Sequence, residues 1–231
     1  MEAPAERPRL QLLLIGPQGA GKGTQGDRLA RWYRMPHVAT GELLRAAIRD
    51  GLPLGLEAKT YMDSGELVPD ELVISILDER FRLDDARNGF ILDGFPRTTK
   101  QAAALDDMLD GDGSGNGINA VVSLEVPDPI LVQRLSDRWT CLQCGRVYNT
   151  TDHQPVEPGH CNNDGSLLVH REDDNPDAIK RRLALFHSET KPVIEFYEDN
   201  GLVEHIEGVG RIEEVQGRIV AALARRGFRR G

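Results

Sequence analysis

Short uninterrupted apolar runs alternate along the chain with longer stretches in which apolar residues recur every three or four positions. The runs predict strands buried on both faces of a parallel sheet, and the periodic stretches predict amphipathic helices. This alternation predicts an α/β fold. The predicted strands are 10–15, 37–39, 90–93, 120–126 and 202–206. The predicted helices are 22–34, 40–48, 56–63, 71–81, 128–135, 176–190, 192–200 and 212–225, with Thr40 and Asn175 as N-terminal caps.

Two parts of the chain depart from this alternation. Residues 137–174 contain short β-like pieces such as 146–148, many turn residues and all three cysteines, which indicates an inserted small domain. Residues 110–117 are rich in Gly, Asp and Ser. They resemble the opening of a calcium-binding loop, but Val121 stands where that loop requires Glu, so a flexible loop is predicted instead.

A glycine-rich turn connects the first predicted strand to the first predicted helix. Its sequence predicts a phosphate-binding loop (the P-loop): Gly16-Pro17-Gln18-Gly19-Ala20-Gly21-Lys22-Gly23-Thr24. The glycines allow successive N–H groups to face one point, the helix N-terminus adds positive potential, and Lys22 supplies a mobile cation. The general pattern requires Ser or Thr directly after the lysine, whereas this chain has Gly23. The alternative is a glycine turn without a ligand, which the flanking strand and helix disfavour.

Polar residues after the third predicted strand extend this site. Asp93 ends the strand, and in P-loop enzymes an acid at the end of a neighbouring strand helps to hold Mg²⁺. Arg97 follows in Gly94-Phe95-Pro96-Arg97, at the edge of the sheet where ligands bind in open α/β folds. It is therefore a candidate phosphate clamp, with a solvated surface arginine as the alternative.

The cysteines form a second candidate site. Cys141 and Cys144 are separated by two residues, and Cys161 and Asp164 repeat this spacing after sixteen intervening residues. Two such pairs predict a closed structural zinc site with four tetrahedral ligands. A metal would also supply folding energy to an insert that is too small for a good apolar core. Two alternatives remain: three free cysteines, or a nearby histidine as the fourth ligand, either His153 or His160.

Composition narrows the class of protein. The chain has 231 residues, 39% hydrophobic and 28% charged, with a net charge of −9. This size accommodates one large α/β domain with insertions, and the negative charge argues against broad nucleic-acid or anionic-membrane binding. No apolar run approaches a membrane span, and residues 1–9 lack the apolar core of a signal peptide. We therefore expect a cytoplasmic protein without a disulfide framework.

Taken together, the motifs resemble those of the adenylate kinases with a long, metal-binding lid, and the resemblance covers about residues 10–222. It rests on Gly-Ala-Gly-Lys-Gly-Thr-Gln at 19–25, Thr40-Gly41 with Arg45, Gly94-Phe95-Pro96-Arg97 with Gln101, and Arg171-x-Asp173-Asp174 before Arg182. The Gly-Lys-Gly-Thr variant of this family accounts for the glycine after the lysine. The chain departs from the family pattern at Pro17-Gln18, Ala39, Glu42 and Val209-Gly210.

The resemblance implies a P-loop NTPase-type core, in which helices cover both faces of a five-stranded parallel sheet. It implies that 1–38, 69–136 and 175–231 form this core, that 39–68 is a small helical AMP-binding segment, and that 137–174 is a small β-rich lid with structural zinc. The implied reaction is reversible and converts MgATP and AMP to two ADP. The implied partners are these nucleotides and Mg²⁺, and a monomer is expected.

The resemblance also implies a role for each motif residue. ATP would be bound by Gly19, Ala20, Gly21, Lys22, Gly23, Thr24, Arg134, Arg138, Val147, Tyr148 and Gly210. AMP would be bound by Thr40, Arg45, Glu66, Leu67, Val68, Gly94, Arg97, Gln101, Arg171 and Arg182. The catalytic set would be Lys22, Asp93, Arg97, Arg138, Arg171 and Arg182, and the zinc ligands Cys141, Cys144, Cys161 and Asp164. Phosphoryl transfer suits such a set, because it requires two anionic substrates held in line and their charge neutralised.

Two alternatives stay open. One is a kinase of another nucleoside monophosphate, or an AMP kinase that uses GTP. Relatives acting on UMP and CMP usually have a short lid without the cysteine site, which disfavours that version. The other alternative belongs to a different class, a nucleotide-dependent binding switch with a zinc interaction module. Such a switch does not require the acceptor-side residues, and the net charge of −9 disfavours nucleic acid as its partner.

Overall fold

The computed structural model describes residues 9–110, 117–150 and 153–230. The predictions for residues 1–8 of the N-terminal arm and for residues 111–116 of the glycine-rich loop lie outside the described residues. Among the described helices, none combines the length and the apolar character needed to cross a lipid bilayer.

The five predicted strands form one parallel sheet in the order β2-β3-β1-β4-β8. The strands are β1 (Leu10–Ile15), β2 (His37–Ala39), β3 (Gly89–Asp93), β4 (Ala120–Glu125) and β8 (Val203–Glu207). Asp93 at the end of β3 lies beside Leu14 of β1 and Ala39 of β2. The strands β1, β2 and β3 therefore end at the same level, which brings the P-loop, Asp93 and the helix after β2 to one edge of the sheet.

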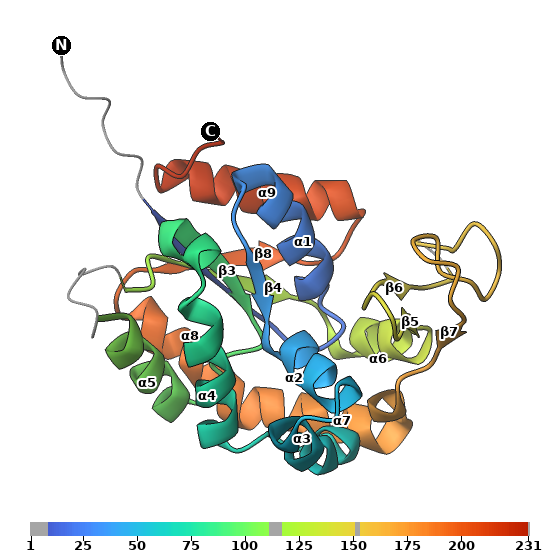
Figure 1. Cartoon of the computed structure of the whole chain (residues 1–231). Coiled ribbons are helices and arrows are strands. Elements are labelled where there is room, and N and C mark those ends of the chain that lie inside the picture. Colours follow the sequence, from blue (N-terminus) through green and yellow to red (C-terminus); the bar gives the residue numbers. More distant parts are fainter. Residues whose placement is uncertain (1–8, 111–116, 151–152, 231) are drawn as a thin grey trace.

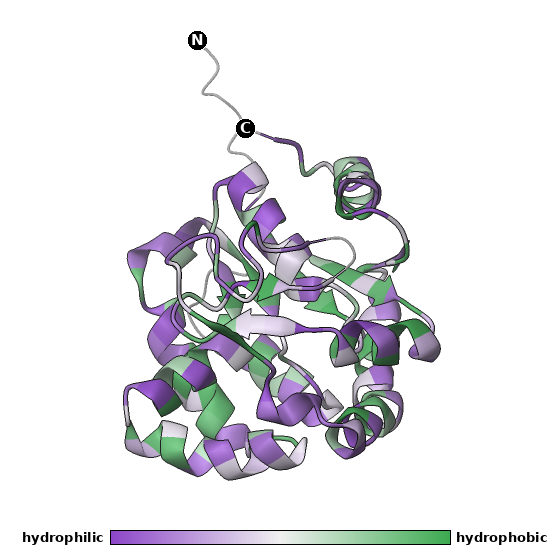
Figure 2. Cartoon of the chain, turned by 90° about the vertical axis from the view of Figure 1, so that its right-hand side faces the viewer, coloured by the Kyte–Doolittle hydropathy of each residue, from purple (hydrophilic) through white to green (hydrophobic). Residues whose placement is uncertain are grey.

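Helices cover both faces of this sheet (Figure 1). Leu12 and Leu14 belong to one buried cluster and Leu13 and Ile15 to the other, since successive side chains of a strand point to opposite faces. The first cluster includes residues of α1 (Lys22–Tyr33), α6 (Asp128–Ser136), α7 (Pro176–Leu185) and α9 (Ile212–Arg225). The second includes residues of α2 (Thr40–Arg49), α3 (Pro53–Ser64), α4 (Asp70–Phe81), α5 (Thr99–Asp110) and α8 (Lys191–Glu198). The helices carry green and purple sides in Figure 2, as this packing requires. The predicted α/β fold is confirmed.

A second, smaller sheet lies apart from the first, at the right of Figure 1. It is antiparallel, with the order β6-β5-β7. Its strands are β5 (Trp139–Cys141), β6 (Val147–Tyr148) and β7 (Leu168–Val169). Its small core contains the buried side chains of Cys141, Tyr148, Cys161 and Leu168. The stretch that interrupts the α/β pattern therefore folds as a separate small β unit.

Some element boundaries differ from the predicted ones. Helix α5 and the short 3-10 helix Asp84–Asn88 (η1) were not predicted, and α3 begins three residues early, at Pro53. Thr40 was predicted as a cap but is the first residue of α2, and its Oγ1 donates to the carbonyl oxygen of Asp93 at 3.2 Å. The predicted N-cap of α7 is confirmed, because Asn175 Oδ1 accepts from the N–H of Ala178 at 2.9 Å.

The predicted helices 176–190 and 192–200 form one continuous helical rod, residues 176–198, which contains α7 and α8. Between α7 and α8 lies a π-helical turn, Phe186–Thr190 (η3), instead of a break. The N–H of Lys191 donates to the carbonyl oxygen of Phe186, five residues earlier. Pro192 has no N–H and its ring conflicts with an ordinary helical turn before it, so the wider turn lets the rod continue through the proline.

Candidate functional site

The P-loop has the curled backbone that a phosphate cradle requires. Gly19 and Gly21 have φ angles of 82° and 96°, in the left-handed region that favours glycine. Lys22 bends back over the loop, and its Nζ donates to the carbonyl oxygens of Gly16 at 2.7 Å and Pro17 at 3.0 Å. The lysine ammonium is therefore held at the edge of the loop by two neutral acceptors.

Lys22 is surrounded by other cations. Burial lowers the pKa of Lys22 to about 8; Asp93 opposes this shift, while Arg97, Arg182 and Arg138 add to it. These three arginines come from the loop after β3, from α7 and from the residues between α6 and β5. Side chains that are far apart in the sequence thus converge on the P-loop lysine.

Asp93 is held beside the P-loop by His37, to which the sequence analysis gave no role. His37 Nδ1 lies 2.8 Å from Asp27 Oδ1, and its Nε2 lies 3.7 Å from Asp93 Oδ2. Burial alone would lower the pKa of His37, but the two carboxylates outweigh it and raise the pKa to about 9. Burial would raise the pKa of Asp93, but His37 and Lys22 lower it overall. The Asp93 carboxylate is therefore ionised.

We predict that His37 makes stability depend on pH. Its pKa is raised in the folded chain, so its contribution is fully present below about pH 6.5 and is lost as the pH rises through about 9. The unfolding free energy of the wild type should therefore fall relative to that of His37→Gln by about 2–3 kcal/mol across this window. Lys22 has a lowered pKa and the opposite sign, but it is present in both proteins. Urea unfolding of both proteins at several pH values measures the difference, and parallel pH curves would refute the role of His37.

Two of the converging arginines are paired with buried acids. Arg138 Nε donates to Asp174 Oδ2 at 2.7 Å, and its Nη2 contacts the other carboxylate oxygen. Arg182 Nη1 lies 2.7 Å from Asp173 Oδ2. Both acids are buried. Burial lowers the pKa of Arg182 to about 10, with Asp173 opposing and Arg138 adding to the shift. The ion pairs therefore fix both guanidinium groups near the P-loop.

A further group of charges joins α2 to the small sheet. Glu42 Oε1 lies 2.6 Å from Arg45 Nη2 and 3.1 Å from Arg171 Nη2. Arg49 Nη1 donates to the carbonyl oxygen of Leu142 at 3.1 Å. The carboxylate of Glu42, one of the departures from the family pattern, thus lies between two arginines of the candidate acceptor site. The helical segment and the small sheet are in direct contact in this structure.

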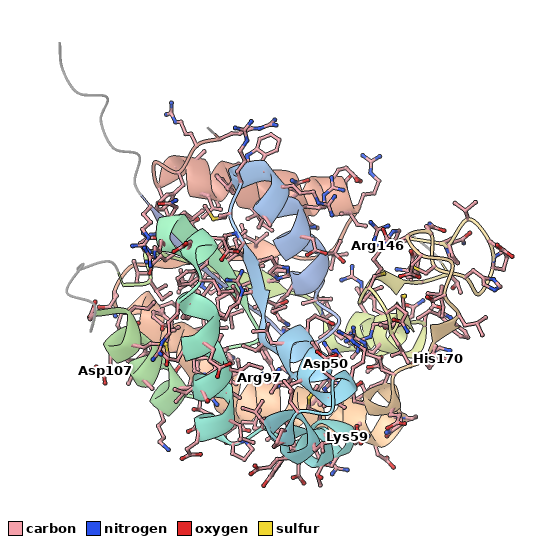
Figure 3. All side chains as sticks on the ribbon, in the orientation of Figure 1. Asp50, Lys59, Arg97, Asp107, Arg146 and His170 are labelled. Atoms are coloured by element: carbon pink, nitrogen blue, oxygen red, sulfur yellow. The ribbon has the colours of Figure 1, made fainter. Side chains whose placement is uncertain are left out.

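Arg97 is half-buried and is labelled in the lower central part of Figure 3. Its Nε donates to the carbonyl oxygen of Gly94 at 2.8 Å, and its backbone N–H donates to Gln101 Oε1 at 2.7 Å. Gln101 Nε2 donates to Asp70 Oδ1 at 2.7 Å. The oxygen and the nitrogen of the Gln101 amide therefore each make a hydrogen bond inside the protein.

Arg134 connects two loops on the other side of the P-loop. Its Nη1 donates to the carbonyl oxygen of Gly19 at 3.3 Å, and its Nη2 donates to that of Gly208 at 3.2 Å. Gly210, two residues further on, has a φ angle of 124°. Arg134 thus contacts Gly19 directly and also contacts the loop that contains Gly210. All three residues are expected on the ATP side.

Other expected nucleotide-binding side chains point elsewhere. Tyr148 is buried in the small sheet, and its Oη lies 3.4 Å from Cys161 Sγ. Val68 is buried in the second core cluster. Glu66 Oε1 lies 3.9 Å from Nη1 of Arg181, which belongs to α7. Tyr148 and Val68 can therefore offer a ligand chiefly their backbone atoms.

Among the residues that the structure describes, basic side chains outnumber acidic ones at this edge of the sheet. The basic residues are Lys22, Arg45, Arg97, Arg138, Arg171 and Arg182. The acidic residues are Glu42, Asp93, Asp173 and Asp174. The excess of positive charge is opposite in sign to the net charge of −9 of the whole chain. Burial also lowers the pKa of Arg171 to about 10, with Arg45 and Arg138 adding to the shift. The cations repel one another, so bound anions would relieve the repulsion.

The four predicted metal ligands meet in the small sheet. One donor atom from each of Cys141, Cys144, Cys161 and Asp164 lies within 4.8 Å of the others. The two halves have the same local geometry: the N–H of Gly145 donates to Cys141 O at 3.0 Å, and that of Gly165 donates to Cys161 O at 2.9 Å. Both glycines have a left-handed φ, 74° and 72°. Asp164 completes this group of possible metal ligands, and neither His153 nor His160 belongs to it. This donor set fits a tetrahedral metal ion.

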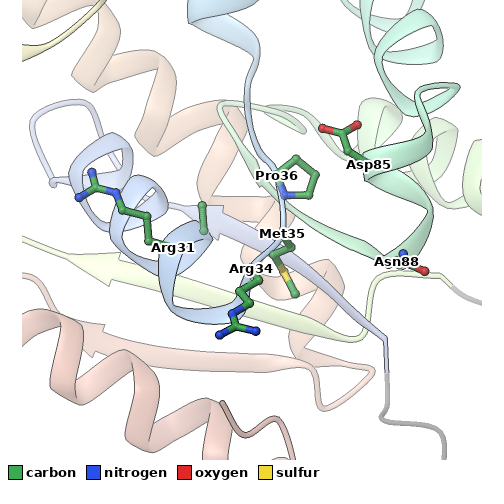
Figure 4. A pocket seen from close by; sticks show the side chains of 7 residues that line it. Arg31, Arg34, Met35, Pro36, Asp85 and Asn88 are labelled. Carbon is green, nitrogen blue, oxygen red and sulfur yellow. The ribbon is translucent and has the colours of Figure 1, made fainter. Parts of the chain in front are cut away.

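A hollow of about 520 Å³ lies away from these two sites (Figure 4). It lies between the end of α1 and η1. Its lining residues are Ala30, Arg31, Arg34, Met35, Pro36, Asp85 and Asn88. None of these lining residues belongs to the cluster of charged side chains at the carboxyl edge of the sheet. We therefore assign the hollow no part in phosphate binding.

Comparison with known proteins agrees with this arrangement. Residues 14–202 match the sequence model of the family described as "Adenylate kinase". The chain belongs to the adenylate kinase family. It is similar to the adenylate kinase of Geotalea daltonii, with 44% identity over 93% of this chain and 99% of that protein. It shares 45% identity with the Syntrophobacter fumaroxidans adenylate kinase, over 93% of this chain and 100% of the relative. The Bacillus subtilis adenylate kinase is 44% identical over 89% of this chain and 94% of its own length.

Proposed function

We propose that this chain catalyses reversible phosphoryl transfer from MgATP to AMP, giving two ADP. The observation that carries the proposal is a convergence of cations at one edge of the sheet. Arg97, Arg138 and Arg182 lie near Lys22 of the P-loop. Arg171 lies near Arg45 of α2 and near Arg138. Two polyanionic substrates need such a surplus of cations, and phosphoryl transfer needs little else from side chains. The family membership of the chain supports the same reaction.

On the donor side, the backbone N–H groups of residues 19–24 and Lys22 bind the ATP phosphates. Arg134 and Gly210 lie towards the adenine, because Arg134 already connects the P-loop to the loop after β8. Val147 and Tyr148 complete this side through their backbone. The N-terminus of α1 adds its positive potential to the phosphate site.

On the acceptor side, Arg45, Arg97 and Arg171 bind the AMP phosphate. The Glu42 carboxylate supports this assignment, because it lies between Arg45 and Arg171 and marks a position where negative charge is stabilised. The adenosine part of AMP contacts Thr40, Glu66, Leu67, Val68, Gly94 and Gln101. Arg182, the last residue of the acceptor set, also acts on the moving phosphoryl group.

During transfer, Arg138 and Arg182 neutralise the charge on the moving phosphoryl group. Their ion pairs with Asp174 and Asp173 hold them in place before substrates bind, so little reorganisation is needed. Asp93 holds the Mg²⁺ that accompanies ATP, and its ionised carboxylate beside Lys22 fits that role. When bound, Mg²⁺ offsets the charge of the ATP phosphates. The lid, residues 137–174, closes on the AMP-binding segment, residues 39–68, and excludes water that would otherwise hydrolyse ATP.

The cysteine group holds a structural zinc ion. Three thiolates and one carboxylate fill the four positions of a tetrahedral site, so none remains for catalysis. The core of the small sheet contains few buried side chains, and metal binding therefore supplies much of its folding energy.

We predict that Cys144→Ser removes the metal and destabilises the chain. Zinc content should fall from about one per chain to near zero, because serine is a poor ligand for zinc. The melting temperature should drop by about 10 °C, equivalent to roughly 3 kcal/mol for a chain of this size. Elemental analysis and calorimetry measure the two effects. Leu142→Ala is the control, since this exposed side chain lies in the same turn. Unchanged zinc in the serine variant would refute the site.

The proposed function is tested with a panel of acceptors. AMP, GMP, UMP and CMP are each offered with MgATP, and AMP is also offered with MgGTP. Fast transfer from ATP to AMP alone is the expected result. Transfer chiefly to another acceptor, or only from GTP, would contradict the adenine specificity. Absence of transfer to all four acceptors would favour a nucleotide-dependent binding switch with a zinc module.

A further inference from the structure

A hydroxyl group from the helical rod 176–198 reaches the backbone of Arg97. Thr190 Oγ1 donates to the carbonyl oxygen of Arg97 at 3.0 Å. Thr190 is buried, with 8% of its surface exposed. The backbone N–H of Arg97 donates to Gln101 Oε1 at 2.7 Å. The backbone of Arg97 is therefore held on both sides, by Gln101 four residues away and by Thr190 in a different element.

The π-helical turn explains how Thr190 comes to lie there. Buried residues of α7, such as Ile179 and Leu183, belong to the first core cluster, whereas Val193 and Ile194 of α8 belong to the second. The rod therefore passes from one face of the sheet to the other, with α7 beside α6 and α8 beside α5. The turn lies at this crossing, and its extra residue rotates the following side chains by about 100° around the rod axis.

We propose that Thr190 is a positioning residue for the acceptor phosphate, acting through Arg97. This inference rests on the function proposed above. Arg97 lies in a loop between β3 and α5, without the ladder bonds of a helix or strand. Its guanidinium is directed by a bond from Nε to Gly94 O, and this bond depends on where the backbone of Arg97 lies. A hydroxyl that fixes the Arg97 carbonyl therefore fixes the guanidinium.

The effect should be confined to the acceptor side. Lys22 is held by carbonyl groups of its own loop. Arg138 and Arg182 are held by the buried pair Asp173 and Asp174. These contacts of Lys22, Arg138 and Arg182 do not involve Thr190. Loss of its hydroxyl should therefore loosen Arg97 and leave the ATP site as it is.

The test compares KM values of three variants. Thr190→Val keeps the shape of the side chain and removes the donor, leaving the Arg97 carbonyl without this partner. We expect the KM for AMP to rise about tenfold, as the loss of one partly buried hydrogen bond predicts. The KM for MgATP should stay within about twofold. Thr190→Ser retains the hydroxyl and should restore the KM for AMP. Tyr197→Phe is the matched control, because it removes another buried hydroxyl of the same rod, one bonded to Asp106 on α5.

The outcomes separate this inference from the proposed function. Wild-type chain that transfers no phosphoryl group to AMP would count against the proposed function itself. An active wild type combined with an unchanged KM for AMP in Thr190→Val would overturn the role of Thr190. Equal rises for both substrates, or an AMP effect of the same size in Tyr197→Phe, would also overturn it, since they indicate general loosening. If the valine variant does not fold, Thr190→Ala removes the same donor without a new methyl contact and is judged by the same criteria.

Discussion

Replacing Lys22 with methionine is expected to lower kcat/KM for MgATP by about 10²- to 10³-fold, or roughly 3–4 kcal/mol of transition-state stabilisation. Methionine has a similar length but carries no charge. The lysine Nζ is already held at the P-loop by two carbonyl groups, so the ammonium is in place before ATP binds. Steady-state kinetics with saturating AMP measures the loss.

Lys180→Met is the control for this variant, because Lys180 is an exposed lysine on α7. It should have close to wild-type kinetics. A near-normal rate for Lys22→Met would show that the ammonium of the P-loop lysine does not stabilise the transferring phosphoryl group.

Replacing Arg97 with alanine is expected to impair AMP far more than ATP. The kcat/KM for AMP should fall by about 10²-fold, or roughly 3 kcal/mol, as the loss of charge-assisted hydrogen bonds to a phosphate predicts. The KM for MgATP should change by no more than about threefold. Arg97 is half-buried near Asp93 and Arg45, on the side of the sheet edge opposite Arg134. KM and kcat measured separately for each substrate provide the comparison.

The exposed Arg31, in the hollow of Figure 4, gives a control for the loss of one arginine. Arg31→Ala should leave both substrates unaffected. Equal losses of kcat/KM for AMP and ATP in Arg97→Ala would contradict the assignment of Arg97 to the acceptor side. They would indicate a residue that contacts the phosphates of both substrates.

The parts of this protein that could be predicted from sequence are those in which the signal is local. The P-loop depends on glycines next to a lysine, and the metal site depends on two short spacings that each form the same turn. Helix α5 was missed even though Thr98-x-x-Gln101 is a capping pattern, and Thr98 Oγ1 does accept from the N–H of Gln101 at 3.2 Å. Three consecutive alanines and few large apolar residues weaken the periodicity of that helix.

The contacts that sequence reasoning could not supply connect residues that are distant along the chain. Glu42 pairs with Arg171, and Thr190 bonds to Arg97, and neither pair has a spacing that signals contact. His37 reads as part of a short strand, and its position beside Asp93 follows only from the register of β2 on β3. Sheet register and helix crossing decide such contacts, and both are set by packing of the whole core.

Incubation with ADP alone tests the proposed phosphoryl transfer directly. The chain is incubated with MgADP, and nucleotides and inorganic phosphate are quantified over time. Because the proposed reaction is reversible and both sites accept ADP, ATP and AMP should appear in equal amounts until equilibrium, without release of phosphate. Unchanged ADP, or release of phosphate without ATP, would contradict the proposed adenylate kinase activity.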